Sequence, residues 1–245
     1  MIPKIIHYCW FGGNSLPEDA KKCIASWKKF FPEYEIKEWN ESNFDINCCS
    51  YVKEAYEMKK YAFVSDYARF WILFHYGGLY FDTDVEVIKN MDHIITKGNF
   101  MGFEKSLPEA PLGVNPGLGI GSFPNESLLK NILEHYQKRA HFTFDGHTVV
   151  TITTDILKDF GFVNEHKLQK IANFIIYPAD YFCPMDSTTG IITTTDHTVA
   201  IHHYSCSWLN KNSVRFKLHL LKNKLIKIFG EKWVMSLSKI FRSWI

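Results

Sequence analysis

The chain has 245 residues, of which 46% are hydrophobic and 16% aromatic, and its formal net charge is +2. This composition excludes a disordered or low-complexity chain and suffices for one sizeable core. The six cysteines form no C-x-x-C pair or zinc-ligand spacing, so we expect reduced thiols. We find no leader-peptide pattern and no run of about 18 apolar residues, so we expect a cytoplasmic protein without a membrane-spanning helix.

The charge is divided unevenly along the chain. Residues 211–245 carry nine Lys or Arg and one Glu, for a charge of +8, which leaves −6 on residues 1–210. Two apolar stripes at helical spacing run through this basic segment. We therefore expect one domain over 1–210 and a basic amphipathic helical tail over 211–245. Two alternatives stay open for the tail: peripheral contact with the inner, anionic face of the cell membrane, or a helical hairpin packed on the domain.

Apolar periodicity and turn residues predict strands alternating with helices. In chain order, strands are predicted at 4–10, 34–39, 79–81, 85–88, 99–104, 174–177 and 199–204, and helices at 17–30, 51–76, 126–138 and 148–159. The helix at 51–76 is either continuous or broken. Residues 107–121, rich in Pro and Gly, are expected to form a loop. The β-α-β opening is Rossmann-like, so the predicted fold class is α/β.

The chain is organised around residues 61–87, YAFVSDYARFWILFHYGGLYFDTDVEV. We expect a helix, a stop at Gly77 and Gly78, and a short buried strand that ends just before Asp82 and Asp84. Ligands of open α/β sheets bind outside the carboxyl ends of the strands. Two carboxylates one residue apart repel each other unless a cation lies beside them, and hard oxygen ligands suit Mg²⁺ or Mn²⁺ together with substrate phosphates. The stretch therefore predicts a metal–diphosphate site.

Asp66 and Arg69 are three residues apart and share one face of the preceding helix. An acid and a base in so aromatic a helix are costly to bury unless they pair or bind something polar. One interpretation gives sugar hydroxyls to Asp66 and a phosphate to Arg69. The other is an ordinary ion pair between neighbouring turns.

These residues resemble the signature of glycosyltransferases with a sugar-binding D-x-D motif, and most closely that of glycosyltransferase family 32. The matching residues are Ser65, Asp66, Arg69, Gly77, Gly78, Tyr80, Asp82 and Asp84. The resemblance implies a single-domain GT-A fold and a retaining transfer of a hexose from a UDP- or GDP-sugar donor, with Mn²⁺ or Mg²⁺. It also implies a glycan or lipid-linked acceptor, as in capsular or surface polysaccharide synthesis, and no nucleic-acid partner.

The resemblance extends to a block near the N-terminus. His7, Trp10 and Gly12 match the family's H-x-x-W-x-G pattern, which implies that Trp10 stacks on the nucleotide base. Stacking of this kind is worth about 1–3 kcal/mol. The two glycines after the first strand, taken alone, favour a plain turn.

A second matching block lies late in the chain. His203 and Trp208 fit the family's H-x-x-x-S-W pattern, which implies that His203 lies near the metal and diphosphate and that Trp208 helps to bind the donor. Cys206 departs from the pattern, and a histidine on a strand is more often a core residue than a ligand. The stretch that contains Asn115 and Gly121 borders the acceptor in the family; its alternative is an ordinary surface connection.

The resemblance assigns a role to each member of the motif. Asp84 is expected to bind the metal directly, and Asp82 to contact ribose, donor sugar or the metal. Asp66, Arg69 and Tyr80 complete the expected catalytic and donor-binding set, with Gly12 in the loop near the nucleotide.

Two other functions stay open. The first is a haloacid-dehalogenase-like phosphatase, with Asp82 as nucleophile and Asp84 as acid and base. Against it, the motif lies far into the chain and no later paired-acid motif follows. The second is a non-catalytic nucleotide-sugar-binding protein, which the complete set of acids and Arg69 disfavours.

Overall fold

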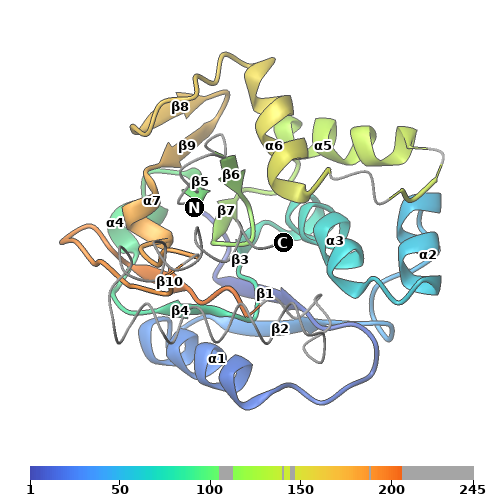
Figure 1. The fold of residues 1–245 in the computed structure, drawn as a ribbon, viewed down its shortest axis with the longest axis horizontal. Helices are drawn as coiled ribbons and strands as arrows, with labels where there is room; N and C mark the ends of the chain where they lie inside the picture. Colours follow the sequence, from blue (N-terminus) through green and yellow to red (C-terminus); the bar gives the residue numbers. More distant parts are fainter. Residues whose placement is uncertain (105–112, 140, 144–146, 188, 206–245) are drawn as a thin grey trace, which may run out of the picture.

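The fold is that of a computed structural model that describes residues 1–104, 113–139, 141–143, 147–187 and 189–205 (Figure 1). Within these residues, strands and helices alternate around a central sheet, so the predicted α/β class is confirmed. The predicted tail at 211–245 lies outside the described residues. The division at residue 210 therefore stays a prediction.

Eight strands of the described chain form the central sheet, in the order β2-β1-β3-β7-β5-β9-β8, with β6 paired to β5. Strands β2, β1 and β3 are parallel, β7 runs against them, and β5 and β9 are parallel to each other. Their bounds are Ile5–Cys9 (β1), Glu35–Trp39 (β2), Gly78–Tyr80 (β3), Asn99–Glu104 (β5), Gly113–Asn115 (β6), Ile120–Ser122 (β7), Gln169–Ile171 (β8) and Phe174–Tyr177 (β9).

A smaller sheet pairs β4, Val85–Val87, antiparallel with β10, Ala200–His202. The register sets His202 opposite Val85 and Ala200 opposite Val87. Only residues 81–84 separate β3 from β4, so the two sheets are joined through the segment that contains both aspartates. This pairing also brings the end of the described chain against its middle.

Alternating side chains of the first strand reach helices on opposite faces of the sheet. Tyr8 packs edge-on to Trp27 of α1 (Glu18–Phe30), with ring centroids 5.8 Å apart. His7, one residue earlier, lies 6.4 Å from the ring of Tyr76 at the end of α3 (Tyr61–Tyr76). Helices α1 and α3 therefore cover opposite faces of the sheet around β1 (Figure 1).

The predicted helix over 51–76 is the broken form: α2 covers Ser50–Glu57 and α3 begins at Tyr61. Lys59 between them has a φ of 58°, a left-handed conformation that a continuous helix cannot contain. Helix α3 ends as predicted at Gly77, whose φ is 63°. Because the next turn would need a φ of about −60°, the chain leaves the helix and enters β3 directly.

The Pro- and Gly-rich stretch at 107–121 was predicted to be a loop, and this is wrong at residues 113–115 and 120–121, which belong to strands. Strands β6 and β7 occupy Gly113–Asn115 and Ile120–Ser122, and both pair with β5. Glycines weaken the strand pattern in the sequence, but here they let large neighbours approach closely. Residues 107–112 lie outside the described residues.

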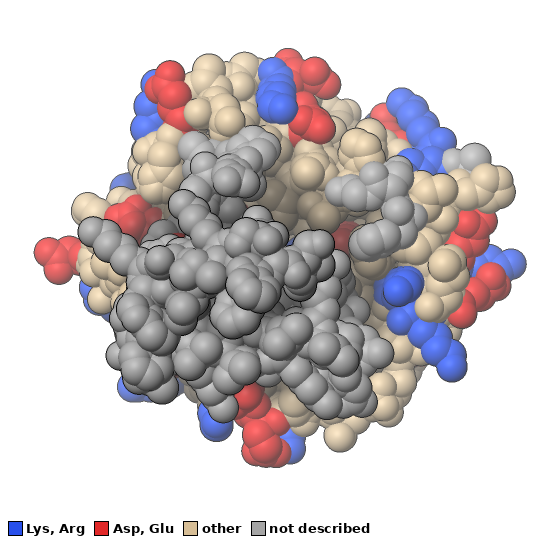
Figure 2. Space-filling model, viewed as in Figure 1, with Lys and Arg blue, Asp and Glu red and all other residues tan. Residues whose placement is uncertain are grey.

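The remaining helices lie around the sheet. They are α4 (Asp92–Ile95), α5 (Ser127–Lys138), α6 (Val149–Lys158) and α7 (Ala179–Phe182); the short α4, α7 and β8 were not predicted. In the described part of the chain, no helix is both long enough and apolar enough to cross a membrane. On the face shown in Figure 2, the described basic and acidic side chains are intermixed around the rim.

Candidate active site

The segment that contains the D-x-D motif is held by backbone hydrogen bonds from two directions. The N–H of Asp82 donates to the carbonyl of Gly117 at 3.0 Å, in the turn between β6 and β7. The carbonyl of Asp84 accepts from the N–H of His203 at 2.9 Å, just after β10. The protein's own hydrogen bonds therefore fix the main chain at each aspartate.

Asp82 belongs to a buried charge cluster. A single guanidinium nitrogen of Arg69, Nη2, lies 2.8 Å from Asp66 Oδ1 and 3.1 Å from Asp82 Oδ1. The hydroxyl of Tyr80 donates to the same Asp82 oxygen at 2.9 Å, and the Arg69 guanidinium lies over the Tyr80 ring at 5.0 Å. The Arg69 side chain is only 3% exposed, whereas that of Asp82 is 30% exposed. The cluster thus presents Asp82 from a rigid base.

One guanidinium between two carboxylates leaves an excess negative charge in a buried place, which is costly unless a proton or another cation compensates it. Burial raises the pKa of Asp66 to about 7, the charge of Arg69 opposes that rise, and Asp82 adds to it. The other guanidinium nitrogen, Nη1, is buried without a hydrogen-bond partner. The cluster has both a carboxylate and a donor nitrogen left for a polar ligand.

Gly117 forms the wall beside this cluster. A Cβ added there would lie 2.0 Å from Asp82 Oδ2 and 3.0 Å from Arg69 Nη1. Real Cβ atoms essentially never approach that closely, so only glycine leaves room for the Asp82 carboxylate. Sequence analysis did not select Gly117, because the loop contains several glycines and only the fold shows which one meets the motif.

Asp84 is held differently, by two residues near the end of the described chain. The backbone N–H and the hydroxyl of Ser205 both donate to Asp84 Oδ2 at 2.9 Å. His202 Nε2 lies 3.3 Å from Asp84 Oδ1, with both side chains largely buried. Burial acts to raise the pKa of Asp84, but the charge and hydrogen bond of His202, with the Ser205 donors, hold it well below its usual range. Asp84 therefore stays ionised.

The structure sets His202, rather than its neighbour, against the motif. His203, which the sequence analysis assigned to the metal, makes a 2.8 Å contact with Glu86 through Nε2. Successive side chains of a strand point to opposite faces, so only one of two adjacent histidines can reach Asp84. The choice depends on the register between β10 and β4, which the sequence does not reveal. The metal role of His203 stays a prediction, while His202 and Ser205 are the residues that sequence reasoning missed.

The chemistry of this set fits a divalent cation. Asp84 Oδ1 keeps a lone pair beyond its contact with His202, and the Ser205 hydroxyl oxygen, which donates its proton to Oδ2, keeps lone pairs of its own. Asp84 raises the pKa of His202 against the effect of burial, so His202 pairs with the carboxylate as an imidazolium and positions it rather than binding the ion. Within the described residues, no three His, Cys, Asp or Glu side chains converge on one point. A cation here would need other oxygens, such as those of a diphosphate, to complete its coordination.

Trp10 lies in the same pocket as Asp84. This pocket has a volume of about 460 Å³ and lies between α1 and the β3–β4 turn. Trp10 is half-buried, and its indole N–H donates to the carbonyl of Asn14 at 2.7 Å, which fixes the ring. The pocket is lined by Trp10, Pro17, Asp19, Ala20, Lys22, Cys23, Thr83, Asp84, Glu86, His203 and Ser205. An aromatic ring and an ionised carboxylate thus share one hollow.

Packing explains why residue 12, two positions after Trp10, is a glycine. Its φ is 95°, and an added Cβ would lie 2.3 Å from the ring of Tyr61. Its N–H donates to Glu41 at 2.6 Å, so in this structure that group is already used. The donor-binding role expected for Gly12 stays a prediction.

The two weak acceptor candidates are both buried. Asn115 Oδ1 accepts from the N–H of Gly117 at 2.7 Å, so it shapes the turn that contacts Asp82. Gly121 lies in β7, where an added Cβ would come within 2.2 Å of the Phe100 ring. Contact of either residue with an acceptor stays a prediction. Trp208 lies outside the described residues.

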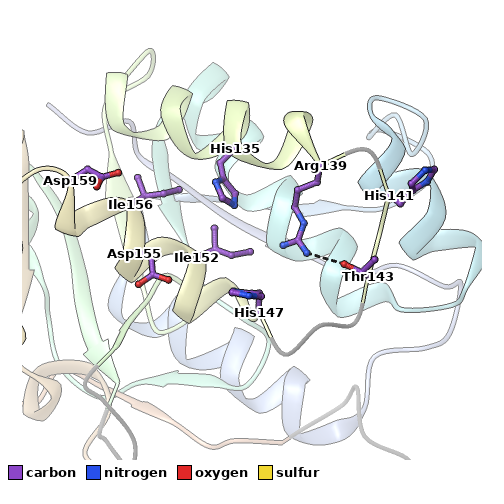
Figure 3. Close-up of a pocket in the computed structure, with 9 residues that line it drawn as sticks. All are labelled: His135, Arg139, His141, Thr143, His147, Ile152, Asp155, Ile156 and Asp159. Carbon is purple, nitrogen blue, oxygen red and sulfur yellow. Dashed lines mark hydrogen bonds between the residues drawn. The ribbon is translucent and has the colours of Figure 1, made fainter.

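A second hollow, of about 720 Å³, is lined by residues of α5, α6 and the segment between them (Figure 3). Arg139 projects into it and donates to the Thr143 hydroxyl at 3.3 Å. No residue selected from the sequence lines it. Its lining consists of His135, Arg139, His141, Thr143, His147, Ile152, Asp155, Ile156 and Asp159. The pocket beside Asp84 is therefore the candidate active site.

Comparisons with known proteins find similarity in the part of the chain that contains the motif. Residues 17–101, which contain both aspartates of the motif together with Asp66 and Arg69, match the model of the glycosyltransferase sugar-binding region containing the D-x-D motif. The chain is 28% identical to the uncharacterized glycosyltransferase L373 of Acanthamoeba polyphaga mimivirus, over 94% of this chain and 89% of the relative. It is 27% identical to inositol phosphoceramide mannosyltransferase 1 of Schizosaccharomyces pombe, over 62% of this chain.

The chain spans about half the length of that yeast relative, with 48% of it covered. Among solved structures, the chain is similar to the PaToxG glycosyltransferase, with a TM-score of 0.48, 19% identity, and coverage of 64% of this chain and 69% of the other. The sequence matches therefore show that residues 17–101 are similar to the glycosyltransferase sugar-binding region that contains the D-x-D motif.

Proposed function

We propose that this protein transfers a hexose from a UDP- or GDP-sugar to a glycan or lipid-linked acceptor with retention at the anomeric carbon, and that Mn²⁺ or Mg²⁺ assists. One observation carries the proposal: Asp84, kept ionised by His202 and Ser205, lines the same pocket as the fixed ring of Trp10. Such a pocket offers a carboxylate site for a diphosphate-bound cation and an aromatic face for a base.

Different residues would bind different parts of the donor. Trp10 would stack on the base, and Asp84 and Ser205 would hold the cation, with His202 positioning the Asp84 carboxylate. A bound divalent ion stabilises the negative charge that develops on the departing nucleoside diphosphate. Asp82, 30% exposed and held by Tyr80 and Arg69, would bind the ribose or the donor sugar.

Asp66 and Arg69 do not line the pocket that contains Asp84; they would complete the donor site from the buried side of Asp82. Asp66 accepts hydrogen bonds from sugar hydroxyls when it is ionised. Arg69 Nη2 pairs with both carboxylates and so fixes Asp66 and Asp82, while Nη1 has no protein partner. The guanidinium would also add positive charge near the diphosphate. Charge fixed in a dry site costs little reorganisation when the bond to the leaving group breaks.

The names of the matching relatives support an order in which donor sugars and acceptors are ranked for this protein. Several matching relatives are mannosyltransferases that act on inositol phosphoceramide, a lipid. We therefore put mannose first among donor sugars and a lipid-linked saccharide first among acceptors. Cytoplasmic localisation at the inner face of a membrane fits such an acceptor, and the basic segment 211–245 would then be the point of contact.

Thermal unfolding with single UDP- and GDP-sugars, each with and without Mn²⁺, tests the donor class. A true donor raises the melting temperature in proportion to ln(1 + [L]/Kd), and its effect should need the metal. Release of nucleoside diphosphate on addition of an acceptor then separates a transferase from a binding protein. Stabilisation by no sugar nucleotide, or release of free phosphate from a phosphate ester, would refute the proposal.

A further inference from the structure

His7, at the centre of β1, is fully buried and does not line the pocket that contains Asp84. Its side chain reaches the turn between α3 and β3, where Nε2 lies 3.0 Å from the carbonyl oxygen of Gly77. On the other side of the ring, the indole N–H of Trp39 donates to Nδ1 at 3.1 Å. Both ring nitrogens therefore contact partners in other elements of the fold.

These two partners determine where the imidazole carries its proton. An indole N–H only donates and a carbonyl oxygen only accepts. Nδ1 of His7 is therefore the acceptor, and Nε2 carries the proton and donates it to the carbonyl of Gly77. Burial lowers the pKa of His7 to about 4, against the effect of the hydrogen bond to Gly77, so the ring is neutral at pH 7. The same hydrogen bond is thus present across the neutral pH range.

The turn that accepts this hydrogen bond has little conformational preference of its own. Gly77 and Gly78 have φ angles of 63° and 99°, and glycine loses more conformational freedom on folding than any other residue. A Cβ on Gly78 would lie 2.7 Å from the carbonyl oxygen of Ile5 and 3.1 Å from His7 Nε2, so glycine is what lets the imidazole come this close. The hydrogen bond from His7 therefore selects one conformation of a turn that two glycines leave free.

The same residue also holds the other end of β3. The backbone carbonyl of His7 accepts from the N–H of Phe81 at 3.2 Å, and His7 is paired with Tyr80 in the register of β1 and β3. Asp82 is the next residue along the chain. His7 thus bonds to the main chain just before β3 through its imidazole and just after β3 through its backbone.

We propose that His7 is a positioning residue for the donor site, which sets Arg69 of α3 against Asp82 by fixing the turn between them. The 3.1 Å contact between Arg69 and Asp82 spans this turn. When the turn relaxes, the guanidinium and the carboxylate shift relative to each other, and a displacement of about 1 Å in a catalytic group costs roughly 100-fold in rate. The effect on rate rests on the proposed function, whereas the effect on the turn does not.

The test compares two substitutions of the same residue in the full chain. His7→Leu removes both ring nitrogens, whereas the side-chain amide of His7→Gln keeps an N–H donor for Gly77. Phe174→Leu, at a fully buried position of β9 in the same sheet, controls for lost stability. Each variant is assayed at a temperature at which it is folded, with Mn²⁺ and the UDP- or GDP-sugar that most raises the melting temperature of the native chain.

We expect His7→Leu to lower kcat for nucleoside diphosphate release about tenfold or more, with a smaller change in the donor KM. The KM should change less because Trp10 and Asp84, which would bind the base and the cation, lie outside this turn. His7→Gln should recover most of the lost kcat, and Phe174→Leu should keep the native kcat. A native kcat in folded His7→Leu, or no recovery in His7→Gln, would overturn the proposal.

Hydrogen exchange tests the turn without any activity. In His7→Leu, the N–H groups of Phe81 and Asp82 should exchange about tenfold faster than in Phe174→Leu at matched stability, because the opening is local to β3. If this occurs while the native chain releases no nucleoside diphosphate from any sugar nucleotide, the proposed function fails and the role of His7 in the turn stands. Unchanged protection of both groups in folded His7→Leu would refute that role.

The native chain gives an answer even if His7→Leu does not fold. Nitrogen NMR of the His7 imidazole should show the neutral ring with its proton on Nε2 between about pH 6 and 8. A proton on Nδ1 of the neutral ring, or an imidazolium in this range, would mean that the hydrogen bond to Gly77 is not made as described and would overturn the proposal.

Discussion

Gly117→Ala is a direct test of the donor site, because it adds one methyl group against the first aspartate of the motif. The new Cβ would start 2.0 Å from Asp82 Oδ2, and ordinary contacts begin near 3.4 Å, so the carboxylate must retreat by about 1.4 Å. Gly117 has no left-handed backbone angle, so alanine itself fits the main chain there. The effect of the substitution is therefore confined to the side-chain clash.

The expected loss follows from what the carboxylate must give up. Its Oδ1 accepts from Tyr80 at 2.9 Å and lies 3.1 Å from Arg69, and hydrogen bonds to charged groups are worth about 1.5–3 kcal/mol each. A displacement of about 1 Å in a catalytic group costs roughly 100-fold in rate. We expect kcat/KM for nucleoside diphosphate release to fall about 100-fold, with a stability loss of about 1–3 kcal/mol.

Two comparisons make this prediction sharp. Gly161→Ala, at a position with nothing within 4 Å of the added Cβ but a φ of 89°, controls for the general cost of replacing a glycine, and its activity should be unchanged. In an Asp82→Ala background, Gly117→Ala should cost clearly less stability than in the native chain, because the clash partner is gone. A folded Gly117→Ala enzyme with native kcat/KM, or an equal stability cost in both backgrounds, would refute the contact argument.

Three further predictions concern the candidate donor site. Asp84→Asn or His202→Gln should abolish the rise in melting temperature that Mn²⁺ gives with a sugar nucleotide, and EDTA should do the same to the native chain; activity that survives EDTA would contradict the metal role. Trp10→Ala should raise the donor KM by the factor that corresponds to about 1–3 kcal/mol of lost stacking, with little change in kcat. An unchanged KM would mean that the ring only packs against its protein neighbours. Because the pKa of Asp66 is raised to about 7 from about 3.9 in the unfolded chain, its protonated form stabilises the fold fully below pH 4, and that stability is lost as the pH rises through 7. The melting temperature of the native chain should therefore fall more steeply between pH 4 and 7 than that of Asp66→Asn, and parallel curves would show that Asp66 does not titrate there.

Local pattern was enough to predict the central part of the site. The aromatic helix, its stop at Gly77 and the carboxylates after a short strand follow from spacing and from the conformational freedom of glycine. The pairing of Asp66 with Arg69 also follows, since residues three apart share a helical face. That Arg69 would also reach Asp82 could not be predicted, because the contact depends on how α3 lies against β3.

The sequence did not reveal the register of the strands or which residues approach one another closely. His202 and His203 are chemically identical, and only the pairing of β10 with β4 turns His202 toward Asp84. Gly117 and Gly121 stand in the same glycine-rich stretch, yet one faces Asp82 and the other Phe100. Strands β6 and β7 were not predicted for a related reason. Glycines that allow close approach have no side chain, so they interrupt the alternation of apolar and polar residues by which a strand is recognised.

The position of the D-x-D turn between two sheets has a mechanical consequence. Asp82 is tied to the central sheet through the carbonyl of Gly117, and Asp84 is tied to the small sheet through His203. A donor whose cation is bound at Asp84 and whose ribose or sugar is bound at Asp82 would therefore cross-link the two sheets, and it would join the middle of the chain to residues 200–205. Such a tie slows every opening motion that separates the sheets. Metal and donor should therefore protect the backbone amides of β4 and β10 from hydrogen exchange more than those of the distant strands β8 and β9.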